Sequence, residues 1–320
     1  MTQPPATRRA FLTGATGFIG ARLLKHLQDE VWQVAALARP AAAASLLSNS
    51  AAAKVYVYDG ETAGVVDAVA DFHPDVVFHL ASLFLSSHHS AQITPLIDSN
   101  IRLGAQILEA MKLAHVTHLV NAGTSWQNYS GDAYNPVNLY AATKQAFEDI
   151  LRYYVLASGI HAITLRLPDS YGPGDKRRKL LRLLLECCET AEPLAMSPGD
   201  QVVDLVHVDD LCRAFLCAAN LVSVQDGANV YAINGGQRRT LRQVVATFEA
   251  AAGKKLPVRF GVLPYREREV MLPWDGPPLP GWKPQIELLE GFRALIDSES
   301  GSVSPHGGCH AGSQGPKEHE

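Results

Sequence analysis

The sequence predicts an α/β protein built on a doubly wound, parallel sheet, followed by a smaller C-terminal domain. Three observations lead to this prediction. Short apolar segments alternate with amphipathic ones over the first half of the chain, and a glycine-rich loop stands at the first junction between them. The alternation stops at Pro168, beyond which proline and glycine become frequent.

The predicted strands are short apolar runs, which suit burial on both faces of a parallel sheet. They are residues 10–13, 33–38, 54–58, 76–80, 118–122 and 162–167. The amphipathic stretches between them predict helices, among them 18–28, 98–114 and 139–158. The crossovers of such strand–helix–strand units should be right-handed.

The change of pattern predicts the domain boundaries. Residues 1–168 should form the sheet domain, with later segments at about 200–235 returning to it, and residues 169–297 should form a cap. Residues 298–320 are rich in Gly, Ser and His, which predicts a disordered tail.

Within the predicted cap, a basic helix is expected at 176–189 and a final helix at 286–296. Residues 202–206 are a strand candidate and 209–221 a helix. An irregular stretch is expected at 263–284, which is rich in proline and tryptophan.

Composition and charge exclude several function classes. The 320 residues are 47% hydrophobic, enough for a sizeable core, and the net charge of −4 favours neither a nucleic-acid nor a membrane partner. No apolar run reaches the roughly 18 residues of a membrane span. The five cysteines form no CxxC pair, and the adjacent Cys187 and Cys188 would point apart on a helix. We therefore expect reduced thiols, a cytoplasmic location and no metal site.

A glycine-rich loop, TGATGFIG, lies between the first strand and the first helix. Gly14 would permit a tight turn, Gly17 would let the backbone approach a pyrophosphate, and Gly20 would let the helix pack close to the sheet. The free N–H groups of the helix N-terminus would face the phosphates. The loop thus predicts a Rossmann-type dinucleotide site, with a GxxGxxG spacing one residue longer than the usual fingerprint. The expected cofactor contacts from this loop are Gly14, Thr16, Gly17, Phe18 and Ile19.

The end of the second predicted strand bears on the choice of cofactor. An NAD site would place an acidic residue there to bind the ribose 2′-hydroxyl, but this chain has Ala38 and Arg39. A guanidinium can pair with a 2′-phosphate and stack on adenine, so we expect NADP(H); an ordinary exposed arginine is the alternative. Asp59, after the third strand, could accept a hydrogen bond from the adenine amino group or form a turn.

Tyr140 and Lys144 are the predicted reacting groups. They are four residues apart in a helical run and therefore share a face, where an ammonium would lower the pKa of the phenol toward working pH. Thr124 or its neighbour Ser125, just past the fifth strand, could donate a hydrogen bond to a substrate carbonyl. Asn100 could hold a water or the active-site backbone, or cap a helix.

Taken in order, these residues resemble the extended short-chain dehydrogenase/reductase family, in its NAD-dependent epimerase/dehydratase group acting on sugar nucleotides. The resemblance runs from residue 9 to about residue 296. Its marks are TGATGFIG, HLAS at 79–82, Asn100, Thr124, YAATK at 140–144, YGPGD at 171–175, DLVHVDDL at 204–211 and GWKP at 281–284. The run VNLYAATKQAFEDIL is also similar to that of the CDP-abequose and CDP-paratose synthase subgroup.

The resemblance implies a role for each matching residue. Thr124, Tyr140 and Lys144 correspond to the catalytic triad and Asn100 to its structural fourth member, in a Rossmann-type domain followed by a smaller C-terminal substrate-binding domain. Further cofactor contacts are expected from Leu80, Ala81 and Leu167. Substrate contacts are expected from Ser82, Ser125, Trp126, Asp169, Lys179 and Arg266.

Departures from the family pattern narrow the expected activity. The family's 4,6-dehydratases carry Asp-Glu after the catalytic threonine as the acid and base for water elimination, whereas Ser125 and Trp126 stand here. Val203 replaces the arginine that helps to bind the substrate diphosphate. Arg266 or the basic run at 176–182 could supply the missing charge, although that run could also be a solvated helix face.

The implied activity is NADPH-dependent reduction of the C4 ketone of a CDP- or dTDP-linked 4-keto-deoxyhexose. The alternatives are a sugar-nucleotide 4-epimerase with tightly held NAD, a ketone or steroid-like reductase, and a non-catalytic NADP(H)-binding sensor. A sensor usually lacks part of the catalytic set, which is intact here.

The family commonly dimerises through the helices at 98–114 and 139–158, so a homodimer is expected. Apolar residues on these helices could serve that contact or could pack on the sheet. They include Ile107, Leu108, Ile150 and Leu151.

Overall fold

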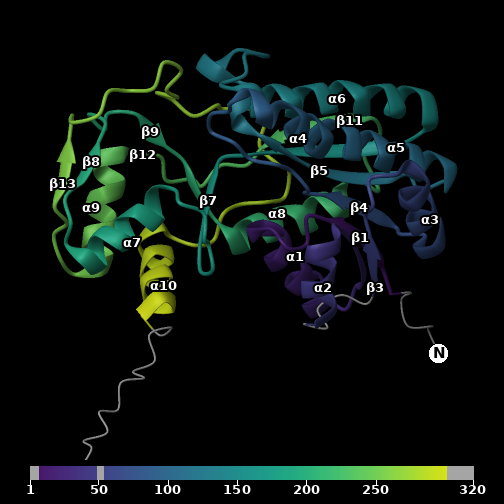
Figure 1. The fold of residues 1–320 in the computed structure, drawn as a ribbon, viewed down its shortest axis with the longest axis horizontal. Helices are drawn as coiled ribbons and strands as arrows, with labels where there is room; N and C mark the ends of the chain where they lie inside the picture. The colour runs from purple at the N-terminus through teal and green to yellow at the C-terminus, as the bar shows by residue number, and fades with distance from the viewer. Residues whose placement is uncertain (1–6, 49–53, 301–320) are drawn as a thin grey trace, which may run out of the picture.

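The computed structural model describes residues 7–48 and 54–300, and its centre is a seven-stranded parallel sheet (Figure 1). The strand order is β11-β6-β5-β4-β1-β2-β3. This confirms the predicted fold class, and the six predicted strands agree with the structure to within two residues at each end. The seventh strand, at one edge, was not predicted. The strands are β1 (Arg9–Thr13), β2 (Gln33–Ala38), β3 (Lys54–Val57), β4 (Val76–His79), β5 (His118–Thr124), β6 (His161–Leu167) and β11 (Ala228–Ala232).

Helices cover both faces of the sheet, as the doubly wound prediction requires. On one face lie α1 (Phe18–Asp29), α2 (Pro40–Ser48) and α8 (Val208–Leu221). On the other lie α3 (Thr62–Phe72), α5 (Leu103–Leu113) and α6 (Leu139–Ser158).

Residues of the central strand β1 alternate between these two layers, because successive side chains of a strand point to opposite faces. Leu12 packs with the α1 side and Phe11 with the α3 side, both fully buried. The sheet is therefore apolar on both faces, as its near-continuous hydrophobic strands predicted.

The segment 98–114, predicted as one helix, consists of a π-helical turn followed by an α-helix. A short helix, α4 (Ile93–Ile97), leads into a π-helical turn, Asp98–Arg102, and only then into α5. Asn100 lies inside the π-helical turn and is buried.

Most elements after β6 form a smaller body, which we call the cap, around a core of its own that includes Leu184, Phe248 and Phe292. Figure 1 shows it beside the sheet domain. Its helices are α7 (Leu180–Thr190), α9 (Leu241–Ala252) and α10 (Leu288–Ser300). Its strands pair two by two: β7 (Asp169–Tyr171) with β10 (Leu205–His207), β8 (Leu194–Met196) with β13 (Val258–Phe260), and β9 (Val202–Val203) with β12 (Arg239–Thr240).

Three expectations for the second half of the chain need correction. The helix expected at 176–189 begins only at Leu180, because its basic residues form a turn in which the Asp175 carboxylate accepts the Arg177 N–H. The strand candidate at 202–206 is two strands separated by Asp204, whose carboxylate accepts the Gly235 N–H. Helix α10 continues to Ser300, so the first residues assigned to the tail are helical. Residues 301–320 lie outside the described part of the chain.

Two features are absent from the described residues. No helix among them is long and apolar enough to cross a membrane. Residues 7–48 and 54–300 also contain no group of three or more His, Cys, Asp or Glu side chains that could hold a metal ion. Cys309 lies beyond these ranges.

Candidate active site

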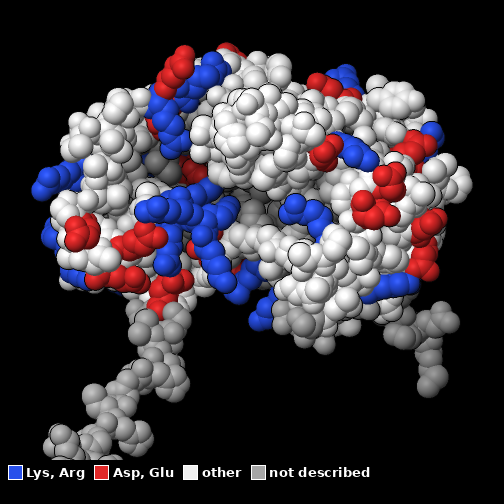
Figure 2. All heavy atoms as spheres, viewed as in Figure 1, with Lys and Arg blue, Asp and Glu red and all other residues white. Residues whose placement is uncertain are grey.

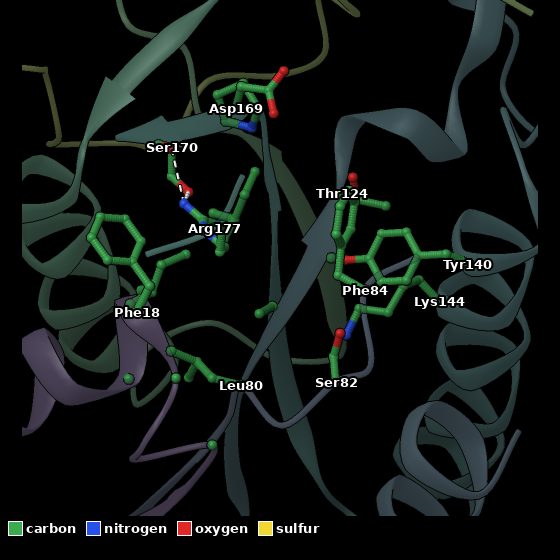
Figure 3. A pocket seen from close by; sticks show the side chains of 18 of the residues that line it. Phe18, Leu80, Ser82, Phe84, Thr124, Tyr140, Lys144, Asp169, Ser170 and Arg177 are labelled. Carbon is green, nitrogen blue, oxygen red and sulfur yellow. Dashed lines mark hydrogen bonds between the residues drawn. The ribbon is translucent and has the colours of Figure 1, made fainter. Parts of the chain in front are cut away.

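A cavity opens at the carboxyl ends of β1, β4, β5 and β6, the edge at which parallel α/β sheets bind their ligands (Figure 3). It brings together most of the predicted site residues. Those that line it are Gly14, Gly17, Phe18, Ile19, Leu80, Ser82, Thr124, Trp126, Tyr140, Lys144, Leu167, Asp169 and Lys179.

The glycine loop has the geometry expected of a phosphate cradle. Gly14 has φ +78°, and a Cβ there would lie 2.7 Å from the Ala81 backbone nitrogen. A Cβ on Gly20 would lie 2.1 Å from the Gly14 carbonyl oxygen, so the helix can approach the loop only through glycine. Gly17 is exposed, and a Cβ there would have only that same carbonyl oxygen nearby, at 3.2 Å.

Helix α1 begins directly after Gly17, and no side chain caps it. Its first N–H groups therefore remain available to a ligand, and the positive end of the helix dipole favours an anion there. A Cβ on Gly17 would fill part of the space in front of these groups. The loop thus fits the diphosphate of a dinucleotide cofactor.

Tyr140 and Lys144 both project from α6 into the cavity, as their spacing predicted. The Asn138 side chain caps this helix by accepting the Ala141 N–H at 2.9 Å, and its amide donates to the Leu85 and Ser86 carbonyls. The cap therefore fixes the start of α6 against the loop that follows β4.

The electrostatics of Tyr140 differ from the prediction. Burial raises the pKa of the phenol, while a hydrogen bond with Ser82 and the positive charge of Arg177 act in the opposite direction. The opposing cation is thus Arg177 of the cap, whereas we had expected Lys144 to lower the pKa. The phenol is protonated at neutral pH and can serve as an acid.

Lys144 is 3% exposed, and burial lowers the pKa of its ammonium to about 8, with Glu148 opposing the shift. Glu148 forms a buried ion pair with Arg166 at 2.7 Å and accepts a hydrogen bond from Gln127 at 2.7 Å. Arg166 also donates to Asn128. A hydrogen-bonded network of buried groups thus supports α6 behind the reacting side chains.

Thr124 and Ser125 have different surroundings. Thr124, the last residue of β5, lines the cavity with Tyr140, and its hydroxyl accepts the Trp126 N–H at 3.3 Å. Ser125 lines a neighbouring cavity that also contains Arg266. The geometry therefore favours Thr124 as the donor to a substrate bound beside Tyr140.

Asn100 holds the active-site backbone, one of the roles considered for it. Its side-chain oxygen accepts the Leu83 N–H at 2.7 Å, and its amide donates to the Leu83 carbonyl and the Thr143 hydroxyl. It thereby joins the loop after β4 to the helix that carries Tyr140 and Lys144.

Several predicted residues lie outside the cavity. Arg39 is exposed at the start of α2 and has no side-chain hydrogen bond or ion pair with the described residues. The Asp59 carboxylate accepts the Glu61 N–H at 2.9 Å and so forms a turn, the alternative considered for it. Thr16 is exposed in the glycine loop. Ala81 does not line the cavity, and its N–H donates to the Thr13 hydroxyl at 3.1 Å. Arg266 is 68% exposed beside Glu269.

Three residues of the site were missed from the sequence. Phe84 lies with its ring centre 5.1 Å from that of Tyr140 and 5.6 Å from that of Trp126. Arg177 lines the cavity from the cap. His79 is buried, shares a hydrogen bond of 2.9 Å with Thr13, and stays neutral because burial lowers its pKa to about 3. Arg177 and His79 had a signal in the sequence, since Arg177 belongs to the basic run and His79 to the HLAS motif, whereas Phe84 had none.

The sheet, the glycine loop and the Tyr140–Lys144 pair define a nicotinamide-dependent enzyme of the short-chain dehydrogenase/reductase class. Residues 10–233 match the model of the NAD dependent epimerase/dehydratase family. The chain belongs to this family.

Known relatives share both sequence and fold with the chain. CDP-abequose synthase from Yersinia pseudotuberculosis is 27% identical over 266 residues, which cover 83% of this chain and 91% of the relative. UDP-glucose 4-epimerase from Thermus thermophilus, solved with NAD, superposes with a TM-score of 0.75 at 26% identity, over 92% of this chain and all of that one. MoeE5 in complex with UDP-glucuronic acid and NAD gives a TM-score of 0.78 at 24% identity, with the same coverage.

Proposed function

We propose that the protein reduces the C4 ketone of a CDP- or dTDP-linked 4-keto-deoxyhexose with NADPH. The observation that carries the proposal is the cavity in which Thr124, Tyr140 and Lys144 stand beside the glycine loop. Ser125 and Trp126 follow Thr124 where an acid–base pair would be needed for dehydration. The likeness to a CDP-abequose synthase supports a CDP-linked substrate.

The reaction adds a hydride to C4 and a proton to the carbonyl oxygen. When bound, the nicotinamide supplies the hydride. Thr124 and Tyr140 donate hydrogen bonds to the oxygen as negative charge develops on it, and Tyr140 transfers its proton. Lys144 holds the nicotinamide ribose and, as a cation, stabilises the phenolate that remains. The raised pKa of Tyr140 suits this direction, because the phenol enters the reaction protonated.

The wall beside Tyr140 supports a deoxygenated sugar. Phe84 and Trp126 line the cavity with their rings, and beside them Asp169 pairs with Lys179 at 2.9 Å. A hydroxyl facing the two rings would lose its hydration without gaining a partner. A methyl or methylene group of the sugar would be accommodated without that cost.

Arg39 supports NADPH as the cofactor. It stands at the end of β2, at the start of α2, and its guanidinium is unpaired among the described residues. An unpaired guanidinium beside a helix N-terminus is well placed to receive a 2′-phosphate.

The substrate diphosphate must be held without the arginine that Val203 replaces. Two further cavities adjoin the active-site cavity, and Arg266 and Val203 line both of them. Lys179 lines one of these two and also the active-site cavity itself. We assign the diphosphate to Arg266 and Lys179.

The decisive experiment follows NADPH oxidation at 340 nm with CDP-4-keto-3,6-dideoxyglucose, beside the dTDP- and UDP-4-keto-6-deoxy sugars, each repeated with NADH. We expect NADPH-dependent turnover of at least one CDP- or dTDP-linked ketone. No oxidation with any of them would refute the proposal.

A 4-epimerase is the second candidate, because solved epimerases with NAD share the fold. Such an enzyme would retain NAD through purification and isomerise a nucleotide sugar without net cofactor consumption. Detection of retained NAD together with isomerisation of a nucleotide sugar would identify the enzyme as an epimerase and not a reductase.

We further propose a cytoplasmic homodimer that associates through α5 and α6. Ile107, Leu108 and Leu151 are at most 2% exposed and pack inside the subunit, so they cannot provide the contact. Leu113, Tyr153 and Leu156 are 56%, 62% and 78% exposed on these helices and are available to a partner.

A further inference from the structure

The basic run of the cap does not form one uniform surface. Figure 2 shows lysine and arginine side chains gathered beside the hollow between the sheet domain and the cap. Arg178 is 78% exposed, pairs with Glu186 at 3.6 Å and does not line the glycine loop's cavity, although it lines the adjoining one. Arg177, its neighbour, is only 33% exposed and lines the cavity that contains Gly17 and Tyr140.

Arg177 is held in place by the cap. Its guanidinium donates two hydrogen bonds to the Asp175 carboxylate, at 2.7 and 2.6 Å, and two more to the carbonyl and hydroxyl oxygens of Ser170, both at 3.0 Å. All four come from Nε and Nη2. Among the described residues nothing accepts a hydrogen bond from Nη1, so this edge of the fork remains available to a ligand.

Arg177 is also held over the glycine loop. Its guanidinium carbon lies 4.5 Å from the ring centre of Phe18, the first residue of α1. Figure 3 shows Arg177 between Phe18 on one side and Thr124 and Tyr140 on the other. A dinucleotide that runs from the loop to Tyr140 would occupy the cavity that this guanidinium lines.

We propose that Arg177 binds the diphosphate of the nicotinamide cofactor from the cap side, opposite the N–H groups of α1. The free Nη1 group can donate to phosphate oxygens, and the positive charge of the guanidinium offsets part of the negative charge of the diphosphate. The cofactor then joins the cap to the sheet domain. This contact would serve any nicotinamide dinucleotide, so it does not depend on the substrate proposed above.

The test measures dissociation constants of NADPH and NADH by quenching of protein fluorescence, for the wild type, Arg177→Gln and Arg178→Gln. Loss of a charge-assisted hydrogen bond should weaken both cofactors about 10- to 100-fold in Arg177→Gln. Arg178→Gln, a neighbouring arginine outside the cavity, should change neither by more than about twofold.

The binding of CDP shows whether Arg177 contacts the diphosphate of the cofactor or that of the substrate. The affinity for CDP, measured by calorimetry, should be the same in Arg177→Gln and the wild type. An unchanged affinity for NADPH overturns the proposal, and so does a loss confined to CDP, which would assign Arg177 to the substrate.

Arg177→Lys keeps the positive charge but not the planar guanidinium group. It should give a smaller loss of NADPH affinity than the glutamine variant. It is the working variant if Arg177→Gln does not fold, as judged by its thermal unfolding. The NADPH and NADH constants can be measured even if no sugar nucleotide is reduced and CDP does not bind, so the two proposals fail separately.

Discussion

At the scale of single residues, the site depends on burial as much as on proximity. Tyr140 and Lys144 stand where their spacing placed them, yet burial raises the pKa of the phenol and lowers that of the ammonium. Both shifts favour the uncharged forms, as removal from water must. The protein therefore presents a neutral acid beside a lysine that titrates near pH 8.

Replacement of Tyr140 by phenylalanine tests the assigned acid. We expect turnover to fall about 100- to 10,000-fold, the usual contribution of a positioned acid, with the affinity for NADPH unchanged within about twofold. Steady-state rates and cofactor titration measure the two quantities. Full activity in the variant would remove Tyr140 from the mechanism.

The pKa of Lys144 predicts the alkaline side of the pH profile. The cation is present below a pKa of about 8 and lost above it, so turnover should decline as the pH rises through 8. Because Glu148 raises this pKa, Glu148→Gln should move the decline to lower pH. The profile of kcat between pH 6 and 10 measures both effects.

Glu148 also pairs with buried Arg166, so the stability of Glu148→Gln must be checked by urea unfolding before its profile is interpreted. Asp149→Asn, on the next position of α6, is the control. A wild-type profile that is flat to pH 10 would show that the charge of Lys144 is not required.

At the scale of elements, the junction of β1 and α1 forms the proposed cofactor loop through a close approach of the helix to the loop. The helix approaches the loop so closely that a Cβ on Gly20 would lie 2.1 Å from the Gly14 carbonyl oxygen. The contacting atom is backbone and cannot rotate away, unlike the end of a flexible side chain. A substitution must therefore displace the whole helix start.

Gly20→Ala should consequently destabilise the protein by about 1–3 kcal/mol, as overpacking does, and weaken NADPH binding. Gly64→Ala is the matched control, since Gly64 lies in α3 and its new Cβ would meet only the Asp59 side chain, at 3.3 Å. Urea unfolding should place the control within about 1 kcal/mol of the wild type. Equal stability and affinity in Gly20→Ala would contradict the predicted role of the close approach.

At the scale of the whole molecule, the sheet domain and the cap carry different parts of the proposed site. The glycine loop and Tyr140 belong to the first, and Arg177, Lys179 and Arg266 to the second. The exposed apolar residues of α5 and α6 lie on helices that cover the sheet, so dimerisation through them would leave the cavity accessible.

Dimerisation can be tested with Leu156→Glu, which places a charge on an α6 side chain that is 78% exposed. We expect the wild type to elute as a dimer and the variant as a monomer in size-exclusion chromatography with light scattering. Val224→Glu, at 79% exposure on another part of the surface, should remain dimeric. A monomeric wild type would refute the proposed association.

Much of the fold was predictable because its signals are local. Apolar runs marked six of the seven sheet strands, and the glycine spacing marked the loop. The start of α7 was misplaced because its basic residues are compatible with a helix, whereas the Asp175 side chain and tertiary contacts hold them in a turn. Phe84 gave no signal, since an isolated aromatic residue after a strand is equally compatible with the core.

The sequence by itself determined the parallel sheet and the glycine loop and predicted Tyr140 and Lys144 as reacting groups, because periodicity and spacing are properties of the chain. Only the tertiary structure decided that Thr124 rather than Ser125 shares the cavity with Tyr140, and that Arg177 reaches Phe18. These residues are far apart in sequence. The contact of Arg177 with Phe18 arises only when the cap packs beside the sheet, and the burial that sets the pKa values of Tyr140 and Lys144 arises only when the chain folds.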